Sequence, residues 1–345
     1  MFYQIARPLL FQLDAETAHN LSIEALKFAP IPSLRMDSAA LSQTFAGLVF
    51  ANPVGLAPGY DKNGEVPSEI LRLGFGFAEV GTLTPLPQQG NPRPRLFRLV
   101  EDAAVINRMG FNNEGQAAAI ARLRNIPENA LIGPLGINIG ANKDSADRVA
   151  DYVTGVQNME SLADYLTVNI SSPNTPGLRA LQDKAALDDL LAKVMEARTQ
   201  DTPVFLKVAP DLQPSDIDDI VAVAMTRGIA ALIVSNTTIS RPVLKSRHAG
   251  EAGGLSGAPL RDMAQQRLLE FRKASGGQMP LIGVGGIASA HDAYARIRAG
   301  ASLVQIYSAL VYQGPGLARK INRDLQHLLQ ADGFINITQA VGVDG

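Results

Sequence analysis

The chain has 345 residues, 46% hydrophobic and 19% charged, and its 31 basic and 33 acidic residues leave a formal net charge of −2. This apolar content can fill a large core, and the lack of a basic excess argues against nucleic acid as a partner. The absence of cysteine excludes disulfides, thiolate nucleophiles, zinc–thiolate sites and iron–sulfur clusters within the chain.

Two short amphipathic helices are predicted at the N-terminus, over Tyr3–Leu13 and Ala15–Phe28, with Asp14 as a candidate cap between them. Neither helix is long enough to span a bilayer, and the chain shows no secretion signal or transmembrane segment. A helical pair of this kind can either pack on the rest of the protein or lie in a membrane interface. We expect residues 1–38 to form a small helical domain.

An alternation of strands and helices is predicted from residue 39 to residue 335. Eight short apolar runs are mostly continuous, which is typical of parallel strands buried on both faces. They are Pro53–Ala57, Phe77–Gly81, Gly133–Asn138, Tyr165–Ile170, Val204–Val208, Ala231–Ser235, Leu281–Gly285 and Leu303–Tyr307. The helical patterns that follow them are Glu65–Leu73, Asn113–Leu123, Ala146–Glu160, Lys184–Arg198, Pro214–Thr226, Pro259–Ser275, Ala288–Ala299 and Leu317–Leu329. Eight such pairs predict an α/β fold, a (β/α)8 TIM barrel, followed by a C-terminal tail over residues 336–345.

A doubly wound sheet is the alternative architecture. The sequence Gly283–Ala288 follows a strand and fits the glycine pattern of dinucleotide-binding sheets. However, no acidic residue lies between Gly300 and Gly316, where the ribose-binding acid of such a fold is expected. The barrel is therefore the preferred prediction. An alternating pattern over Pro92–Met109 predicts a β-hairpin inserted after the second strand.

The C-terminal ends of the predicted strands carry neutral hydrogen-bonding groups, glycine turns and a few lysines. The fourth strand runs into Asn169–Gly177 (NISSPNTPG), and the fifth carries Lys207, whose charge is unusual in the middle of a strand. Since barrel active sites lie at these ends, the rim suits a flat, polar, partly anionic ligand. The loops after the seventh and eighth strands are the usual phosphate site of the fold, which favours a phosphate-bearing cofactor.

Histidine does not contribute to these strand ends. The four histidines, His19, His248, His291 and His327, all fall outside them. We interpret His291 and His327, which lie in helical stretches, as surface or helix-packing residues. A metal site or a Ser-His-Asp triad therefore has little support, and no metal ligand is predicted.

Four longer motifs are more specific than any of these patterns. They are Asn52–Lys62 (NPVGLAPGYDK), Asn107–Asn113 (NRMGFNN), Asn169–Gly177 and Gly283–Ile287 (GVGGI). On these motifs the sequence resembles the dihydroorotate dehydrogenases, specifically the membrane-associated, quinone-reducing class 2 enzymes. The resemblance extends from the N-terminal helices to about residue 330.

The resemblance implies a reaction, a base and a cofactor. The reaction is the oxidation of (S)-dihydroorotate to orotate, the fourth step of pyrimidine synthesis, with one FMN per chain as hydride acceptor and a membrane quinone as co-substrate. Ser172 corresponds to the catalytic base of class 2 enzymes, whereas soluble class 1 enzymes use cysteine, which this chain lacks. Thr175 and Phe111 correspond to residues of the proton relay. They help to hold the water route along which the proton leaves Ser172.

The resemblance also implies two sets of binding residues. The substrate set is Lys62, Asn107, Arg108, Met109, Gly110, Phe111, Asn169, Asn174, Asn236 and Thr237. The FMN set is Pro58, Gly59, Tyr60, Asp61, Lys62, Thr82, Asn138, Asn169, Lys207, Ser235, Gly257, Gly286, Tyr307 and Ser308. Within this set Lys207 is expected near the pyrimidine end of the flavin, where a fixed cation stabilises the reduced form.

The implied partners are dihydroorotate and orotate, a membrane quinone that enters between the N-terminal helices, and the surface of a lipid bilayer. The resemblance implies a peripheral protein on the cytoplasmic side of the bacterial inner membrane, and we expect a monomer. Three alternatives remain open: a fumarate-using class 1 enzyme, a non-catalytic flavin-binding protein, and a scaffold barrel. The N-terminal helices and Ser172 argue against the first, and the polar, lysine-bearing rim argues against the last.

Overall fold

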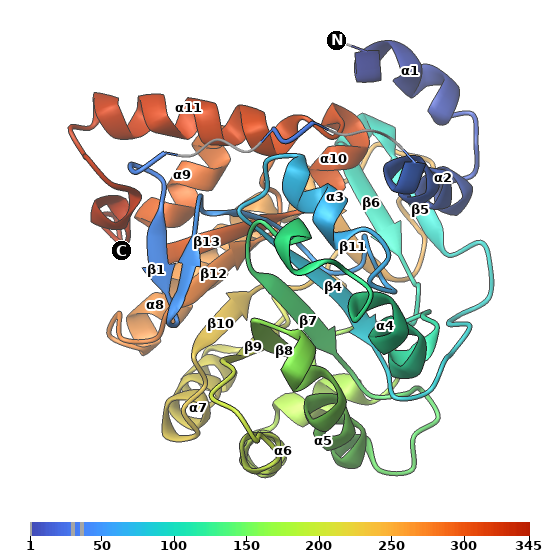
Figure 1. The fold of residues 1–345 in the computed structure, drawn as a ribbon, viewed down its shortest axis with the longest axis vertical. Helices are drawn as coiled ribbons and strands as arrows, with labels where there is room; N and C mark the ends of the chain where they lie inside the picture. The colour runs from blue at the N-terminus through green and yellow to red at the C-terminus, as the bar shows by residue number, and fades with distance from the viewer. Residues whose placement is uncertain (1, 29–31, 35–37) are drawn as a thin grey trace.

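The computed structural model describes residues 2–28, 32–34 and 38–345, and its centre is a closed barrel of parallel strands (Figure 1). Eight strands follow one another around the barrel in chain order, which confirms the predicted fold and excludes the doubly wound sheet. They are β3 (Val54–Leu56), β4 (Phe77–Leu83), β7 (Leu135–Ile139), β8 (Tyr165–Asn169), β9 (Val204–Val208), β10 (Ala231–Val234), β12 (Leu281–Val284) and β13 (Ala301–Ile306).

The eight predicted helices form a ring outside the barrel (Figure 1). They are α3 (Pro67–Arg72), α4 (Gly115–Leu123), α5 (Arg148–Met159), α6 (Lys184–Glu196), α7 (Pro214–Thr226), α8 (Arg261–Ala274), α9 (Ala290–Arg298) and α11 (Leu317–Ala331). Several of these helices have an N-terminal side-chain cap. Asp147 accepts the Ala150 amide at 3.0 Å at the start of α5, and Ser289 accepts the Asp292 amide at 3.2 Å at the start of α9. The helix α10 (Ser308–Gln313), directly after β13, was not predicted.

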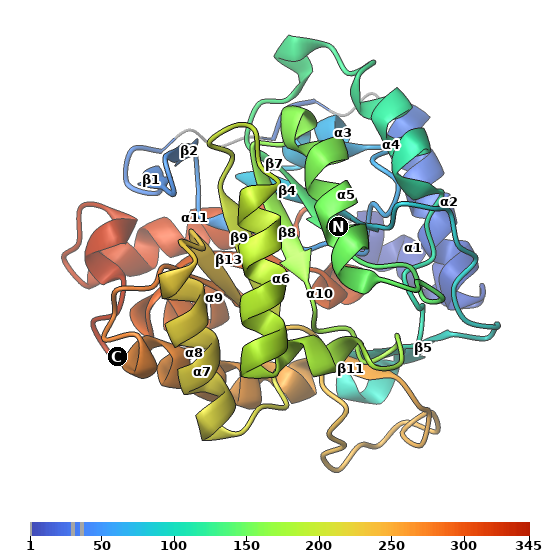
Figure 2. The same ribbon diagram turned by 90° about the horizontal axis from the view of Figure 1, so that it is seen from below.

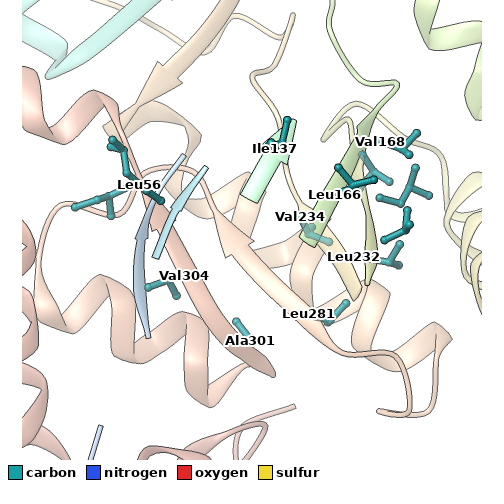
Figure 3. Packing of buried hydrophobic residues seen from close by; sticks show 14 of the residues in the cluster. Leu56, Ile137, Leu166, Val168, Leu232, Val234, Leu281, Ala301 and Val304 are labelled. Carbon is teal, nitrogen blue, oxygen red and sulfur yellow. The ribbon is translucent and has the colours of Figure 1, made fainter. Parts of the chain in front are cut away.

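Apolar side chains fill the space between the strands and the helices. Leu56, Leu166, Val234 and Val304 on four barrel strands are fully or almost fully buried in this layer (Figure 3). The continuous apolar runs of the sequence arise because one set of side chains packs on the helices and the other faces the barrel interior.

An aromatic cluster fills the barrel at the ends where the strands begin. The ring of Phe205 stacks on Tyr165 with 4.4 Å between centroids, and Phe77 contacts Phe50 edge-on at 5.3 Å. Phe45 and Phe50 come from a short hairpin, β1 (Gln43–Phe45) and β2 (Leu48–Phe50), which was not predicted because three-residue strands give almost no periodic signal. This cluster closes the lower end, so a ligand can enter the barrel only from the opposite rim.

The predicted hairpin is present as β5 (Leu96–Leu99) and β6 (Ala104–Asn107), and it acquires a third strand, β11 (Gly254–Gly257). The sequence of β11 resembles a loop, but its glycines are required by close backbone contact. A Cβ atom at Gly257 would lie 2.5 Å from the Ala103 carbonyl oxygen. The resulting sheet stands over one side of the rim and bears the N-terminal helices.

The N-terminal helices α1 (Phe2–Leu10) and α2 (Ala15–Phe28) lie beside α10 and the β5–β6 sheet (Figures 1 and 2). The Asp14 cap is confirmed, because its carboxylate accepts the amides of Glu16 and Thr17 at 3.0 Å. The first helix ends at Leu10 rather than at the predicted Leu13, and Arg98 donates to the carbonyls of Leu10, Phe11 and Leu13 at and after this end. Within the part of the chain that the structure describes, no helix is long and apolar enough to cross a membrane.

The C-terminal residues 336–345, predicted only as a tail, pack against the segment before β1 and against α9. Asn336 donates to the Ala39 carbonyl at 2.8 Å, and the Ile337 amide donates to the Ala40 carbonyl at 2.8 Å. Near the end, Asp344 accepts both 2.6 Å and 2.7 Å hydrogen bonds from Arg298. The tail therefore fastens the segment before β1 to the helical ring.

We expect Ile337→Ala to lower the free energy of unfolding by about 2–4 kcal/mol, because Ile337 is fully buried and its loss leaves a cavity. The matched control is Ile335→Ala, two residues away, whose side chain is 80% exposed and should contribute almost nothing. Denaturant unfolding of both variants measures the difference. Equal destabilisation by the two substitutions would show that burial of the tail does not stabilise the fold.

Candidate active site

A single cavity of about 620 Å³ runs from the N-terminal helices to the C-terminal ends of the barrel strands. Its outer part is lined by Leu10, Phe11 and Leu21 of the helical region and is largely apolar. Its inner part is lined by polar residues of the rim, among them Lys62, Ser172 and Lys207. The cavity therefore joins an apolar entrance to a polar, cationic chamber.

The loop after β8 places Ser172 on the wall of this chamber. Ser172 is 5% exposed, and its hydroxyl oxygen accepts the Asn174 amide at 3.2 Å. The Asn174 side chain in turn donates to Asn107 on β6 at 3.1 Å. Pro173 and Pro176 restrict the backbone of this loop, so the hydroxyl is held in one place.

Neutral amides and hydroxyls form a connected network beneath the loop. Asn169 donates to Thr82 at 3.1 Å, and its carbonyl oxygen accepts the Ser171 hydroxyl at 2.9 Å. Asn236 on the other side donates to the Ser171 hydroxyl at 2.9 Å. Because each of these buried groups has a partner, the network is rigid and presents defined donors and acceptors to a ligand.

Lys62 is a cation of the chamber that faces α2. Its ammonium group lies 3.2 Å from His19 Nε2 of α2. Burial lowers the pKa of Lys62 to about 8, although the more distant Glu16 opposes this shift. Burial and the neighbouring Lys62 also lower the pKa of His19 well below its ordinary value, so His19 is neutral at pH 7 and can accept from the ammonium.

Lys207 is the cation at the base of the chamber. It extends from the middle of β9, is 4% exposed, and has no hydrogen bond or ion pair with any described residue. Burial lowers its pKa, and attraction to Glu79 acts in the opposite direction. A buried ammonium with free donors is suited to an anionic or electron-rich ligand.

Glycines at the ends of β11 and β12 form a shallow cradle. Gly285 and Gly286 have φ angles of 112° and 70°, and a Cβ atom at Gly286 would lie 2.4 Å from the Arg261 Cα atom. Beside them the hydroxyls of Ser256 and Ser308 are 2.7 Å apart and line the cavity. Backbone amides and hydroxyls are the donors that a phosphate group requires.

The structure brings most of the predicted site residues into this one cavity. Those that line it are Pro58, Gly59, Tyr60, Lys62, Thr82, Asn107, Met109, Gly110, Phe111, Asn169, Ser172, Asn174, Lys207, Ser235, Asn236, Thr237, Gly257, Gly286, Tyr307 and Ser308. Phe111 has a φ angle of 53°, an uncommon conformation for a bulky residue and one that often marks a functional position.

Four predicted residues lie just outside the lining. Asp61 accepts the amides of the following turn and shapes it, and Asn138 lies beneath the chamber floor and accepts from Thr82 at 2.5 Å. Arg108 points away to Glu251 at 2.7 Å. Thr175 is 3% exposed, and its hydroxyl has no partner among the described residues.

Several cavity residues were missed by the sequence reasoning. His19, placed apart from every strand end, lies beside Lys62, and Ser22 one turn later is 3.0 Å from the Tyr60 hydroxyl. Arg98 and Tyr312 also line the entrance. His19 and Ser22 belong to a predicted amphipathic helix and Arg98 to the predicted hairpin, whereas Tyr312 lies in no predicted element. The contacts of His19 and Ser22 join segments 38 or more residues apart, so the sequence does not reveal them. Within the described chain no group of three or more histidine and acidic side chains could hold a metal ion.

A buried ion pair fixes α2 to the segment directly before β5, beside the cavity. Glu16 and Arg95 are each 6% exposed and form two hydrogen bonds of 2.6 and 3.0 Å. Arg95 also donates to the Asn91 carbonyl at 2.9 Å, and the Asn91 side chain donates to the Asn174 carbonyl at 3.2 Å. The loop that carries Ser172 and the N-terminal helix are therefore connected through two residues.

Comparison with known proteins identifies relatives over the whole chain. The family model described as dihydroorotate dehydrogenase matches residues 40–329. A protein of Novosphingobium aromaticivorans named dihydroorotate dehydrogenase (quinone) is 62% identical over 344 residues, covering 99% of each chain. One of the same name from Sphingopyxis alaskensis is 63% identical, covering 99% of this chain and 96% of its own.

Solved structures agree with the sequence relatives. The crystal structure of an Eimeria tenella dihydroorotate dehydrogenase in complex with ferulenol has a TM-score of 0.91 and 40% identity, and the similarity covers 96% of each chain. The ligand-free form of the Eimeria tenella protein has the same TM-score and 41% identity, covering 96% of this chain and 99% of that one.

Proposed function

This chain belongs to the dihydroorotate dehydrogenase family, and on that premise we propose that it oxidises (S)-dihydroorotate to orotate with FMN and a membrane quinone. This places it in pyrimidine biosynthesis. The observation that carries the proposal is the single cavity with an apolar entrance between the N-terminal helices and a polar chamber at the barrel rim. The two ends suit a long apolar quinone and a small polar acid, respectively.

The residues present fit FMN. The glycine cradle and the Ser256 and Ser308 hydroxyls suit its phosphate, and Lys207 suits the pyrimidine end of the ring. The other proposed contacts are Pro58, Gly59, Tyr60, Asp61, Thr82, Asn138, Asn169, Ser235, Gly257, Gly286 and Tyr307. When bound, FMN supplies the acceptor for the hydride that leaves C6 of the substrate.

Ser172 is proposed to remove the proton from C5 of dihydroorotate. A serine hydroxyl is a weak base at neutral pH, so it must pass its own proton onward as it reacts. The buried Thr175 hydroxyl has no partner among the described residues and is therefore free to take part in such a relay, with Phe111 nearby on the cavity wall. The rigid loop supports the step by holding Ser172 against the substrate.

Lys62 and the asparagines are proposed to orient the substrate. The Lys62 ammonium suits the carboxylate, and Asn107, Asn169, Asn174 and Asn236, all on the cavity wall, suit the amide edges of the ring. The remaining proposed contacts come from Arg108, Met109, Gly110, Phe111 and Thr237.

We expect Ser172→Ala to slow reduction of the bound flavin by dihydroorotate by about 10²–10⁴-fold, because the proton acceptor is lost. Flavin binding should be unchanged, and Ser172→Cys should retain part of the rate, since a thiol can also take the proton. Stopped-flow absorbance of the flavin measures each rate. Wild-type reduction by Ser172→Ala would assign the base to another residue, and no reduction of the wild-type flavin would reject the proposed activity.

We expect the affinity for orotate to fall as pH rises, because Lys62 loses its proton above about pH 8. An anion binds only the protonated form well, so the dissociation constant should rise up to about tenfold between pH 8 and 9. Titration of the holoenzyme, followed by flavin absorbance, measures this constant. Lys62→Met should weaken binding and flatten the profile, whereas Lys143→Met, at an exposed lysine near the rim, should leave the slope intact.

Residues 1–38 are proposed to form a unit that lies in the membrane surface on the cytoplasmic side of the bacterial inner membrane and admits the quinone to the barrel domain, residues 39–335. Residues 1, 29–31 and 35–37 of this unit lie outside the described part of the chain. The support is the exposure of apolar side chains on the helices: Ile5 is 70% exposed, Leu9 68% and Phe28 82%. We propose that the protein acts as a monomer, since the cavity is complete within one chain.

We expect the double substitution Ile5→Ser and Leu9→Ser to weaken binding to lipid vesicles by at least about tenfold, because two apolar side chains no longer enter the interface. Reduction of a long-tailed quinone should fall in parallel, while flavin reduction by dihydroorotate should be unchanged. The matched control replaces Val243 and Ile335, which are 100% and 80% exposed elsewhere, with serine. Equal vesicle binding by the wild type, the double variant and the control would contradict the membrane proposal.

A further inference from the structure

We propose that Glu79 is a positioning residue that sets the donor and acceptor pattern of the flavin chamber. Glu79 lies in the middle of β4, is 1% exposed, and does not line the cavity. The inference rests on the proposed FMN site and concerns how the protein groups around that site are oriented. A buried carboxylate is costly unless several donors satisfy it, so its presence inside the barrel requires a reason.

Three donors from three other barrel strands converge on Glu79. The side-chain NH2 groups of Asn138 on β7 and Gln305 on β13 donate to it at 2.7 and 2.6 Å. The hydroxyl of Tyr165 on β8 donates at 3.2 Å. An ionised carboxylate can only accept, so both amides must turn their NH2 groups toward it and their carbonyl oxygens away.

The orientation of Asn138 is passed on to the catalytic loop. Its carbonyl oxygen accepts the Thr82 hydroxyl at 2.5 Å and the Asn169 NH2 group at 3.2 Å. Because Asn169 must use its NH2 group there, its carbonyl oxygen faces Ser171, one residue before the proposed base. The carboxylate thus fixes the direction of a hydrogen-bond chain that reaches from the barrel interior to the loop of Ser172.

The orientation of Gln305 produces a free acceptor. Gln305 is fully buried and lines the cavity, and its carbonyl oxygen has no partner among the described residues. A buried acceptor without a partner costs free energy unless a ligand supplies a donor. With its NH2 group held by Glu79, Gln305 is a fixed acceptor, which suits a ring N–H of the flavin.

The charge of Glu79 acts on Lys207 as well. Glu79 is the acid whose attraction favours the protonated form of Lys207 against its burial. The two groups make no ion pair within contact distance, so the ammonium keeps its donors for the ligand. At a pH low enough for Lys207 to keep its proton in the variant, removal of the negative charge should make the chamber more positive and the bound flavin easier to reduce.

The test compares Glu79→Gln with Tyr165→Phe, purified as holoenzymes. Both changes remove a hydrogen bond inside the barrel, but only the first removes the charge and the fixed acceptor. We expect Glu79→Gln to raise the FMN dissociation constant by about tenfold or more. The reduction potential of the flavin that remains bound, measured against reference dyes, should rise. Tyr165→Phe should leave the potential unchanged and the dissociation constant within about twofold of the wild type.

Other outcomes would overturn the assignment. An unchanged FMN affinity and potential in Glu79→Gln, or the same losses in both variants, would reduce Glu79 to a packing role. If Glu79→Gln does not fold, the variant Gln305→Met is tested instead. It should weaken FMN binding without lowering the unfolding temperature below that of Tyr165→Phe, and unchanged binding would reject the proposal. Failure of the wild type to bind FMN would instead reject the proposed function.

Discussion

Closure of the parallel barrel is the constraint on which the rest of this structure depends. Eight strands pair around a ring, so all their carboxyl ends meet at one rim, and residues from β3 to β13 face a common chamber. Closure also leaves an interior that must be filled. Aromatic rings fill its lower part, where Tyr165 stacks on Phe205. The upper part is filled by polar side chains, and this division places the chemistry at one end.

A polar interior is stable only when its groups satisfy one another. In this barrel the solution is a set of mostly neutral amides and hydroxyls around two separated charges, Glu79 and Lys207. Separation matters, because a contact ion pair would consume the ammonium donors that face the ligand. Two of the buried side-chain groups without a partner in the described chain, the Thr175 hydroxyl and the Gln305 carbonyl oxygen, lie in or next to the lining of the chamber. These two groups are available to a ligand or to a proton relay in the proposed site.

The sequence could predict the barrel because its strands are continuous apolar runs separated by capped helices, and all eight were found in order. It could also predict most of the chamber, since strand ends and the four motifs mark it directly. Strands β1, β2 and β11 could not be predicted, because three or four residues, some of them glycine, give no period. His19 and the Glu16–Arg95 pair were missed for a different reason. Their partners are 43 and 79 positions away, and only the packing of α2 brings them together.

The N-terminal helices differ in how firmly they are attached, and the difference agrees with two separate roles. Helix α2 buries Glu16, Ile23 and Leu26, reaches the loop of Ser172 through Arg95 and Asn91, and forms a wall of the cavity. Helix α1 is attached chiefly by polar contacts such as the Tyr3 hydroxyl bond to the Val311 carbonyl, and it leaves its apolar side chains exposed. Firm attachment of α2 suits a wall of the cavity, whereas exposed apolar side chains on α1 suit the proposed membrane contact. The cavity passes between the two helices, so the proposed quinone entrance adjoins both of them, while the loop of Ser172 is connected to α2 through Arg95 and Asn91.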